Sequence, residues 1–199
     1  ALEQEGKEVV VFHTVGSGGE AMEEMIQNED VHAVIDLSLH ELIDHHFGGD
    51  YDAGPDRGCA ALNKGIPAII SPGNIDFLVS GPFKTTKERF PGRIYHIHNA
   101  AITTIRTRKR EVEFIAATIA GFCNNAKGPA GVIIPSEGFS AFDRIGGPFY
   151  DPDAVKVFIR TIKNELSPKI PLRIVPCHIN DPEFSAAVID LLKSIAGSR

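Results

Sequence analysis

The feature of this sequence that most constrains its fold is the alternation of short apolar runs with amphipathic helical segments. Each run has four to six residues and little strict alternation of apolar and polar side chains, which is typical of strands buried on both faces of a sheet. The predicted strands are residues 8–13, 33–37, 68–71, 93–98, 130–135 and 172–176.

Capping residues mark the helices that separate these strands. Asp181 with Pro182, and Asp151 with Pro152, place a carboxylate at the N-cap and a proline in the first turn, and Thr107 is expected to cap a third helix. Further helices are predicted over residues 19–27, 39–46 and 56–64. Strands alternating with helices predict a Rossmann-like α/β fold, a doubly wound and mainly parallel sheet with helices on both faces.

Length and composition favour a single domain over residues 1–199, because 199 residues with 43% hydrophobic content bury one core. The net charge is −6 and charged residues are spread along the chain, so nucleic acid is not an expected partner. Three widely spaced cysteines favour a reducing, cytoplasmic location, and no apolar run nears the ~18 residues of a membrane span. The opening ALEQEG resembles the last turn of a helix ended by Gly6, so we expect a domain cut from a longer protein.

Polar, glycine-containing and histidine-containing segments follow five of the predicted strands. They are residues 13–19, 71–76, 96–101, 135–143 and 177–181. Because ligands bind at the carboxyl ends of parallel strands, we expect these segments to form one site. Turn and cap chemistry explains any single segment equally well.

The glycine-rich turn VGSGGEA has the outline of a dinucleotide-binding fingerprint. Gly16, Gly18 and Ala21 match G-x-G-x-x-G/A, and Asp36 follows at about the expected 20 residues. Against this, Glu20 places a negative charge in the first helical turn. The turn therefore predicts either a dinucleotide site, a simpler phosphate or anion site at a helix N-terminus, or only a tight corner.

The histidines suggest three kinds of chemistry. His96 and His98 would share one face of a strand, and with His178 and Asp143 they could hold a metal, although we expect none. General acid or base roles for His98 and His178 are favoured. Ser140, His178 and Asp143 also form a hydrolase triad on paper, but GFSAF lacks the second glycine of a nucleophile elbow.

Two further features leave alternatives open. Arg106 is expected to begin a helix, where it opposes the helix dipole and is held by a ligand anion or by an ordinary ion pair. Residues 72–92 are expected to form a long irregular loop. This loop supports the alternative of an oligomerisation or protein-interaction module anchored by Phe77, Phe83 or Phe90.

Long motifs along the chain resemble a known family. They are FHTVGSGGEAMEEMI, DLSLHELIDHHFGGDYDAGPDR, GIPAIISPGNIDFLVSGP, HIHNAAITTIRT, PSEGFSAFD and HINDPEFS. The chain resembles the Tm-1-like ATP-binding proteins, the family typified by the tomato mosaic virus resistance protein. The resemblance implies two α/β domains, of which this chain is the second (C-terminal) one, and an association with ATP that involves mainly the first domain. A magnesium requirement is left open.

The predicted function is a ligand-binding half of a cytoplasmic protein that binds ATP or another anionic metabolite in a cleft with its own N-terminal domain, and that forms a homo-oligomer. The predicted ligand-binding residues are Gly16, Ser17, Gly18, Gly19, Ser71, Gly73, Asn74, Asn99, Arg106, Ser136, Gly138, Ser140 and Asn180. The alternative is an enzyme whose catalytic residues are His98, His178 and Asp143.

Overall fold

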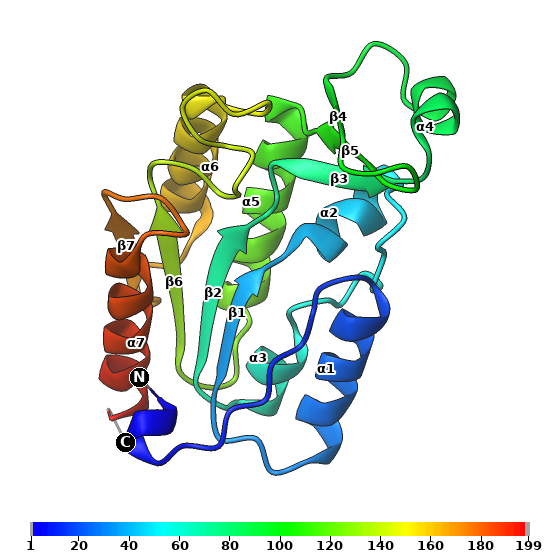
Figure 1. Ribbon diagram of the computed structural model, residues 1–199. Coiled ribbons are helices and arrows are strands. Elements are labelled where there is room, and N and C mark those ends of the chain that lie inside the picture. The colour runs from blue at the N-terminus through cyan, green and yellow to red at the C-terminus, as the bar shows by residue number, and fades with distance from the viewer. Residues whose placement is uncertain (1, 198–199) are drawn as a thin grey trace.

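The computed structural model describes residues 2–197. Its centre is a parallel sheet of four strands in the order β1-β2-β6-β7 (Figure 1). The strands are β1 (Val34–Ser38), β2 (Ala68–Gly73), β6 (Ala130–Pro135) and β7 (Leu172–Val175). All four were predicted from the apolar runs, and β6 has the predicted bounds.

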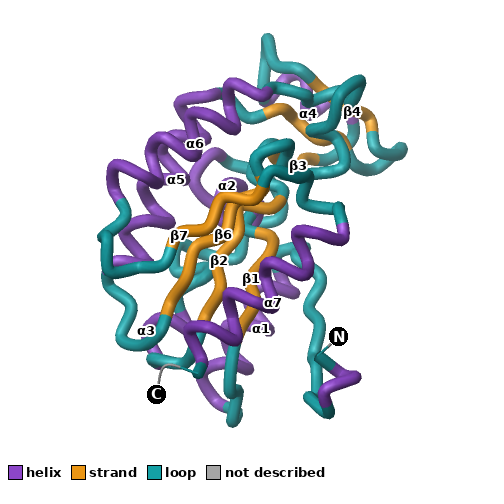
Figure 2. Tube along the Cα trace, turned by 90° about the vertical axis from the view of Figure 1, so that its left-hand side faces the viewer, coloured by secondary structure: helices purple, strands orange, loops and turns teal. Residues whose placement is uncertain are grey.

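Helices cover both faces of this sheet, which confirms the Rossmann-like α/β class (Figures 1 and 2). Ile70 and Val132 pack into a cluster with α2 (His40–Phe47), α3 (Ala60–Lys64), α5 (Lys109–Asn124) and α6 (Pro152–Glu165). Ile69 and Ile133 pack on the opposite face, against α7 (Pro182–Ala196). Neighbouring residues of one strand therefore serve two cores, as the near-continuous apolar runs require.

The remaining N-terminal elements are the short 3-10 helix η1 (Glu3–Glu5) and α1 (Ser17–Asn28). Helix α1 packs against α3, and its Ile26 joins the same core as Ile70. Helix α3 begins at Ala60 and not at the predicted residue 56. The residues before it form a turn in which the Arg57 side chain is buried.

Capping explains where two of the long helices begin. Asp151 Oδ1 accepts the amides of Asp153 (3.1 Å) and Ala154 (3.2 Å), as predicted for the start of α6. The prediction for α5 was one residue early: the N-cap is Arg108, whose amide donates to Glu111. Thr107 instead donates its hydroxyl to the carbonyl of Ile75 (3.0 Å).

The strand predicted over residues 8–13 is wrong. These residues lie extended beside α1 but pair with no strand, and Val11 is 84% exposed. Only the end of this segment is fixed, where the Thr14 hydroxyl lies 3.2 Å from Ser38 Oγ and the Thr14 carbonyl contacts His40. Valines favour a strand only where a neighbouring backbone is available to pair with.

A second, antiparallel sheet was missed. Its strands are β3 (Phe77–Ser80), β5 (Thr103–Arg106) and β4 (Tyr95–Ile97), in the order β3-β5-β4, with α4 (Phe83–Arg89) between β3 and β4. We call residues 77–106 the antiparallel unit; it projects from one end of the molecule (Figure 1).

Three expectations are corrected by this unit. Residues 72–92 are not an irregular loop, because they contain all of β3 and all of α4. The strand predicted over residues 93–98 exists as β4, but it lies outside the parallel sheet. Arg106 ends β5 and does not begin a helix, since α5 starts only at Lys109. Strands β3 and β5 were not recognised from apolar runs, and a local pattern does not show which sheet a strand such as β4 joins.

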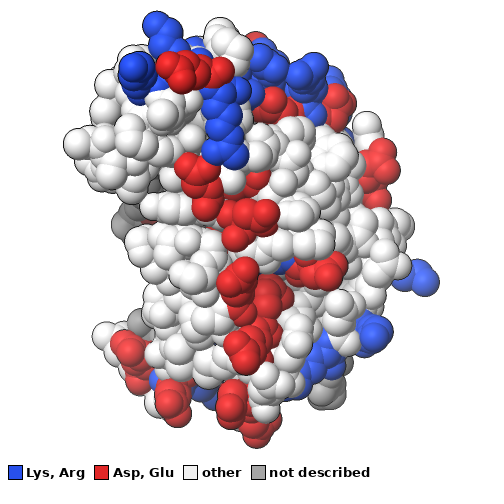
Figure 3. Space-filling model, turned by 90° about the vertical axis from the view of Figure 1, so that its right-hand side faces the viewer, with Lys and Arg blue, Asp and Glu red and all other residues white. Residues whose placement is uncertain are grey.

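Charge is less evenly distributed in space than along the sequence. On the face shown in Figure 3, acidic side chains run across the middle and lower part, while basic side chains gather at the upper end, where the antiparallel unit projects. Among the described residues no helix has both the length and the apolar character to cross a membrane.

Candidate functional site

The glycine-rich turn at the start of α1 binds a carboxylate of the same chain. Gly16 is the N-cap, with φ of 82°. The amides of Gly16 and Gly19 donate to Glu41 Oε1 at 2.6 and 3.1 Å. Two of the amides expected to face a phosphate are therefore already paired with an anion supplied by α2.

Glu41 is part of a buried network centred on Arg57, which is 1% exposed. Arg57 Nε donates to Glu41 Oε2 (2.6 Å), Nη2 donates to Asp36 Oδ1 (3.1 Å), and Nη1 donates to Asp36 Oδ2 and to Glu23 (3.3 Å). Burial alone would lower the pKa of Arg57, but Asp36 and Glu41 outweigh it and raise the pKa. Burial raises the pKa of Glu23.

This network assigns a structural role to the acidic residue of the fingerprint. Asp36 lies in β1 as expected, but both of its carboxylate oxygens face Arg57. A Cβ on Gly19 would overlap the Glu41 carboxylate, and one on Gly18 would overlap the carbonyl of His13. The glycines of the turn thus make room for Glu41 and for the incoming chain.

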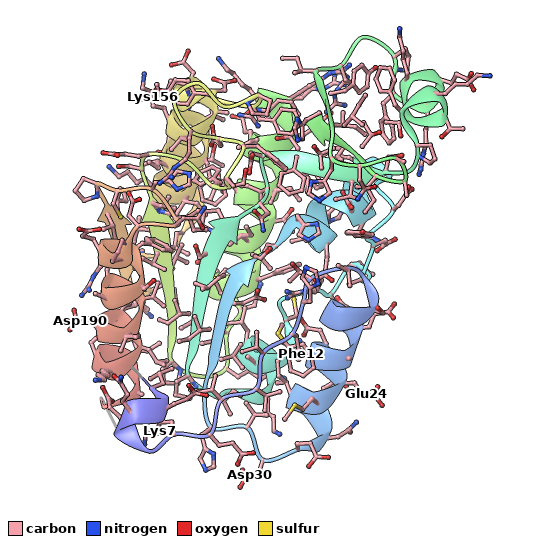
Figure 4. The ribbon with its side chains drawn as sticks, viewed as in Figure 1. Lys7, Phe12, Glu24, Asp30, Lys156 and Asp190 are labelled. Atoms are coloured by element: carbon pink, nitrogen blue, oxygen red, sulfur yellow. The ribbon has the colours of Figure 1, made fainter. Side chains whose placement is uncertain are left out.

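The loops that follow the four parallel strands are joined into one rim. The Leu39 amide donates to the Gly73 carbonyl (3.0 Å), linking the ends of β1 and β2, and the Asn74 amide donates to Phe139 (2.9 Å), linking β2 to the loop after β6. The Ile179 amide donates to Gly138 (3.2 Å), linking the loops after β6 and β7. The rim lies at the end of the sheet away from Lys7 and Asp30 (Figure 4).

Asn74 lies at the centre of this rim. With φ of 61° it is the one non-glycine residue among residues 2–197 that has a positive φ. Its side-chain amide donates to Ser38 Oγ (2.9 Å), and Ser38 in turn contacts Thr14. Non-glycine residues in this left-handed region concentrate at functional sites, and asparagine tolerates it better than most.

His178 is buried in the rim and has no free ring nitrogen. Its Nε2 donates to the Ser140 carbonyl (2.9 Å), and its Nδ1 accepts the Asn180 amide (3.2 Å). A Cβ on Gly138, whose φ is 132°, would overlap the carbonyl of Asp143 and approach the His178 ring. His178 therefore holds two loops together, with both of its ring nitrogens engaged in hydrogen bonds.

A second buried network lies beneath the loop after β6. Ser140 Oγ donates to Asp76 Oδ2 (2.6 Å), and Asp76 is completely buried. Arg106 Nη1 donates to the Asp76 carbonyl (2.8 Å) and to Thr107 Oγ1 (2.9 Å). Asp76 Oδ1 and Arg106 Nη2 are buried without a hydrogen-bond partner in the described chain. Burial is the main cause that raises the pKa of Asp76 to about 7.

Asp76 was not among the predicted site residues, because nothing local in SPGNID separates it from an ordinary turn aspartate. Asp143, which was predicted, braces the same loop: its Oδ2 accepts the Phe139 amide (3.2 Å) and its Oδ1 accepts the Asp151 amide (3.1 Å). Burial raises the pKa of Asp143. Ser71 is also buried, and its hydroxyl has no partner in the described chain.

His98 and Asn99 lie on the antiparallel unit, beside the loop after β6. His98 is exposed, and its ring lies 6.3 Å from that of Phe142 in this loop. His178 contacts Ser140, which belongs to the same loop. Asn99 closes a turn by accepting the amides of Ala101 and Ile102. Within residues 2–197 no three His, Cys, Asp or Glu side chains are arranged to hold a metal ion.

The strand order gives no crevice of its own. In doubly wound sheets a ligand crevice opens where the strand order reverses. Here the order β1-β2-β6-β7 follows the chain order and has no reversal. One small hollow in the interior is lined in part by Arg57, Leu39 and Phe122, and another by Met22 and Asp36.

Sheet, helices and rim together define a Rossmann-like α/β domain whose loops at the carboxyl edge of the sheet face outward. A family model described as "Uncharacterised protein family (UPF0261) C-terminal domain" matches residues 1–196. The chain belongs to this family.

Similar proteins occur in bacteria and in tomato. The chain is 38% identical over 188 residues to a UPF0261 protein of Clostridium tetani, covering 94% of this chain and 46% of that protein. It is 35% identical over 197 residues to the ToMV resistance protein Tm-1(GCR237) of Solanum lycopersicum, covering 98% of this chain and 26% of that protein. A UPF0261 protein of Brucella melitensis is 32% identical over 188 residues, with coverage of 94% and 45%. The predicted resemblance is confirmed, and the chain spans about half the length of these bacterial relatives or less.

Proposed function

We propose that this chain is the ligand-binding half of a longer protein, and that its rim forms one wall of a site for ATP or another anionic metabolite. The rest of the longer protein supplies the second wall. The observation that carries the proposal is the rim itself: loops from all four parallel strands are hydrogen-bonded together around Asn74 at the edge where α/β domains bind ligands.

Two observations support the proposal that the rim forms one wall of a ligand site and not a complete site. The strand order has no reversal, so the sheet does not open a crevice by itself. The chain also covers only 46% of the Clostridium tetani relative, which leaves ample length for a second wall. Sites between domains are common among ligand-binding proteins.

The polar groups that face solvent on this rim are the candidates for ligand contact. Asn180 is exposed, and Ser136 and Asn74 are half-buried. Gly16 and Gly19 are weaker candidates than the sequence indicated, because a phosphate would have to displace Glu41 from their amides. Asp36 cannot serve a ribose while it is paired with Arg57. Homo-oligomerisation and the cytoplasmic location stay predictions.

The test is calorimetric titration of ATP and a panel of phosphorylated metabolites into the longer protein that contains this chain. Asn180→Asp adds a carboxylate on the rim, and Asn63→Asp is the matched control at an exposed position near the end of α3. We expect Asn180→Asp to weaken binding about tenfold, since a like charge near a phosphate costs on the order of 1 kcal/mol in a partly solvated site. Equal affinities of the two variants, or no binding of any panel member, would count against the proposal.

A further inference from the structure

Strand β4 has a free backbone edge. It lies at the end of the order β3-β5-β4 and pairs only with β5. The Arg106 amide donates to the Ile94 carbonyl (2.9 Å) and the His98 amide donates to the Ile102 carbonyl (3.0 Å). Because antiparallel ladders alternate, Ile94, His96 and His98 face β5, while the N–H and C=O groups of Tyr95 and Ile97 face away from it.

Proteins protect sheet edges with very short edge strands, with lysine or proline, with bulges or with a covering segment. Strand β4 is short, with three residues, but no side chain within it is of a protecting type. The strand Tyr95–Ile97 contains no lysine or proline. Ile94 is 60% exposed and Ile97 is 55% exposed, so apolar side chains flank the open backbone groups. An uncovered apolar edge of this kind is suited to pairing with a further strand.

The surroundings of the edge are basic. From Gly81 to Glu111 the sequence has eight Lys and Arg residues and two acidic ones, whereas the whole chain has 20 and 26. Helix α4 packs on β4 through Phe83, whose ring lies 5.6 Å from that of Tyr95, and Lys87 Nζ lies 5.9 Å from the Phe83 ring. Lys84 and Lys87 are exposed on this helix.

We propose that the β4 edge binds an extended, acidic segment of a partner protein, which adds as a fourth strand to the antiparallel sheet. The partner backbone pairs with the outward groups of Tyr95 and Ile97. Its carboxylates lie on the face of the sheet on which α4 packs and face Lys84 and Lys87, and its apolar side chains lie on the opposite face, where they contact Ile94. A second copy of this chain fits less well, because edge-to-edge pairing about a two-fold axis would place two basic units side by side.

The test measures binding of two fluorescent eight-residue peptides to the longer protein by anisotropy. In one peptide valine alternates with glutamate, and in the other valine alternates with lysine. Ile97→Pro removes an outward N–H without breaking a bond to β5, and Ile97→Val is its matched control. The double variant Lys84→Glu/Lys87→Glu tests the charge, with Lys127→Glu, an exposed lysine outside the antiparallel unit, as control.

We expect the glutamate peptide to bind more tightly than the lysine peptide, with affinity that falls as salt is added. Ile97→Pro and the double charge variant should each weaken binding of the glutamate peptide about tenfold or more, and their control variants should bind it as the unmodified protein does. Amide hydrogen exchange at Tyr95 and Ile97 should slow when the glutamate peptide is bound.

Several results would overturn the proposal. They are no binding of the glutamate peptide, equal binding of both peptides, or unchanged binding to Ile97→Pro at unchanged thermal stability. Sedimentation that shows a dimer of the unmodified protein and a monomer of Ile97→Pro would assign the edge to a second copy and reject an acidic partner.

Discussion

Two buried polar networks support the carboxyl edge of this domain, and they differ in completeness. Around Arg57, three carboxylates accept hydrogen bonds from the guanidinium, and Glu41 also binds two amides of the glycine-rich turn. Around Asp76, one carboxylate oxygen and one nitrogen of Arg106 have no hydrogen-bond partner in the described chain.

The complete network around Arg57 has a structural role, whereas the incomplete network around Asp76 is the place where a further group can bind. Buried polar atoms nearly always have a hydrogen-bond partner, so Asp76 Oδ1 and Arg106 Nη2, which has only a distant ion pair with Asp151 (3.9 Å), mark a place that a water or a ligand group completes. The glycine-rich turn, which resembles a phosphate site in sequence, belongs to the complete network, because its amides donate to Glu41. The incomplete network lies under the rim, at Asp76, which was not among the predicted site residues although it ends the predicted segment 71–76.

The largest expected effect comes from breaking the complete network. Arg57→Met leaves Glu41, Asp36 and Glu23 buried without their cation, and we expect the free energy of unfolding to fall by about 3–5 kcal/mol. Urea denaturation measures this. Arg160→Met is the control, because Arg160 makes an exposed ion pair with Glu113 (3.5 Å), and such pairs contribute about 0–1 kcal/mol. Similar losses in both variants would contradict a central role for Arg57.

A smaller effect is expected from filling the space that Glu41 occupies. A Cβ at residue 19 would overlap the Glu41 carboxylate, so Gly19→Ala should lower the free energy of unfolding by about 1–3 kcal/mol. Gly121→Ala in α5 is the matched control, since its Cβ meets no atom within 4 Å. That control should be stabilised by about 0.5–1 kcal/mol. A neutral Gly19→Ala would show that the turn is not closed on Glu41.

The incomplete network should appear in the pH dependence of stability. The folded state keeps the Asp76 proton up to a pKa of about 7, whereas the unfolded chain releases it near the ordinary value of 3.8. Between these values the folded state binds more protons, so stability should fall as pH rises, by at most about 1.4 kcal/mol per pH unit. Asp44, whose pKa burial raises to about 8, contributes a fall of the same sign.

Asp76→Asn isolates the Asp76 contribution. In urea denaturation at several values between pH 5 and pH 7, the variant should show a shallower fall than the unmodified protein, with the Asp44 contribution retained. The same slope in both proteins would mean that Asp76 does not titrate in this range.

The smallest effect is expected at Ser71, one of the predicted ligand residues. Its hydroxyl is buried without a partner in the described chain, so Ser71→Ala should change the free energy of unfolding by less than about 0.5 kcal/mol or raise it slightly. Thr107→Val is the contrast, because the Thr107 hydroxyl donates to Ile75 and accepts from Arg106, and should cost about 1–2 kcal/mol. Equal losses in thermal denaturation would contradict the assignment.

The predictable part of this fold is the part that local patterns determine. Strand β6 and the Asp151 cap of α6 follow from a short apolar run and an Asp-Pro pair. The antiparallel sheet was missed because β3 and β5 were not recognised and because a local pattern does not show which strands pair. The partners of Gly16, Asp36 and Asp76 are far away in sequence, and no spacing rule shows that Glu41, Arg57 and Ser140, respectively, would reach them.

The most direct test of the account is the amide NMR spectrum of the longer protein with and without ATP. We predict that signals of Asn74, Ser136, Gly138 and Asn180 shift on binding, while those of Gly16 and Gly19, whose amides are bound to Glu41, do not. Shifts concentrated at Gly16 and Gly19 would contradict the account and make the glycine-rich turn the phosphate site. ATP binding without any shift in this chain would contradict the proposal that its rim forms a wall of the site.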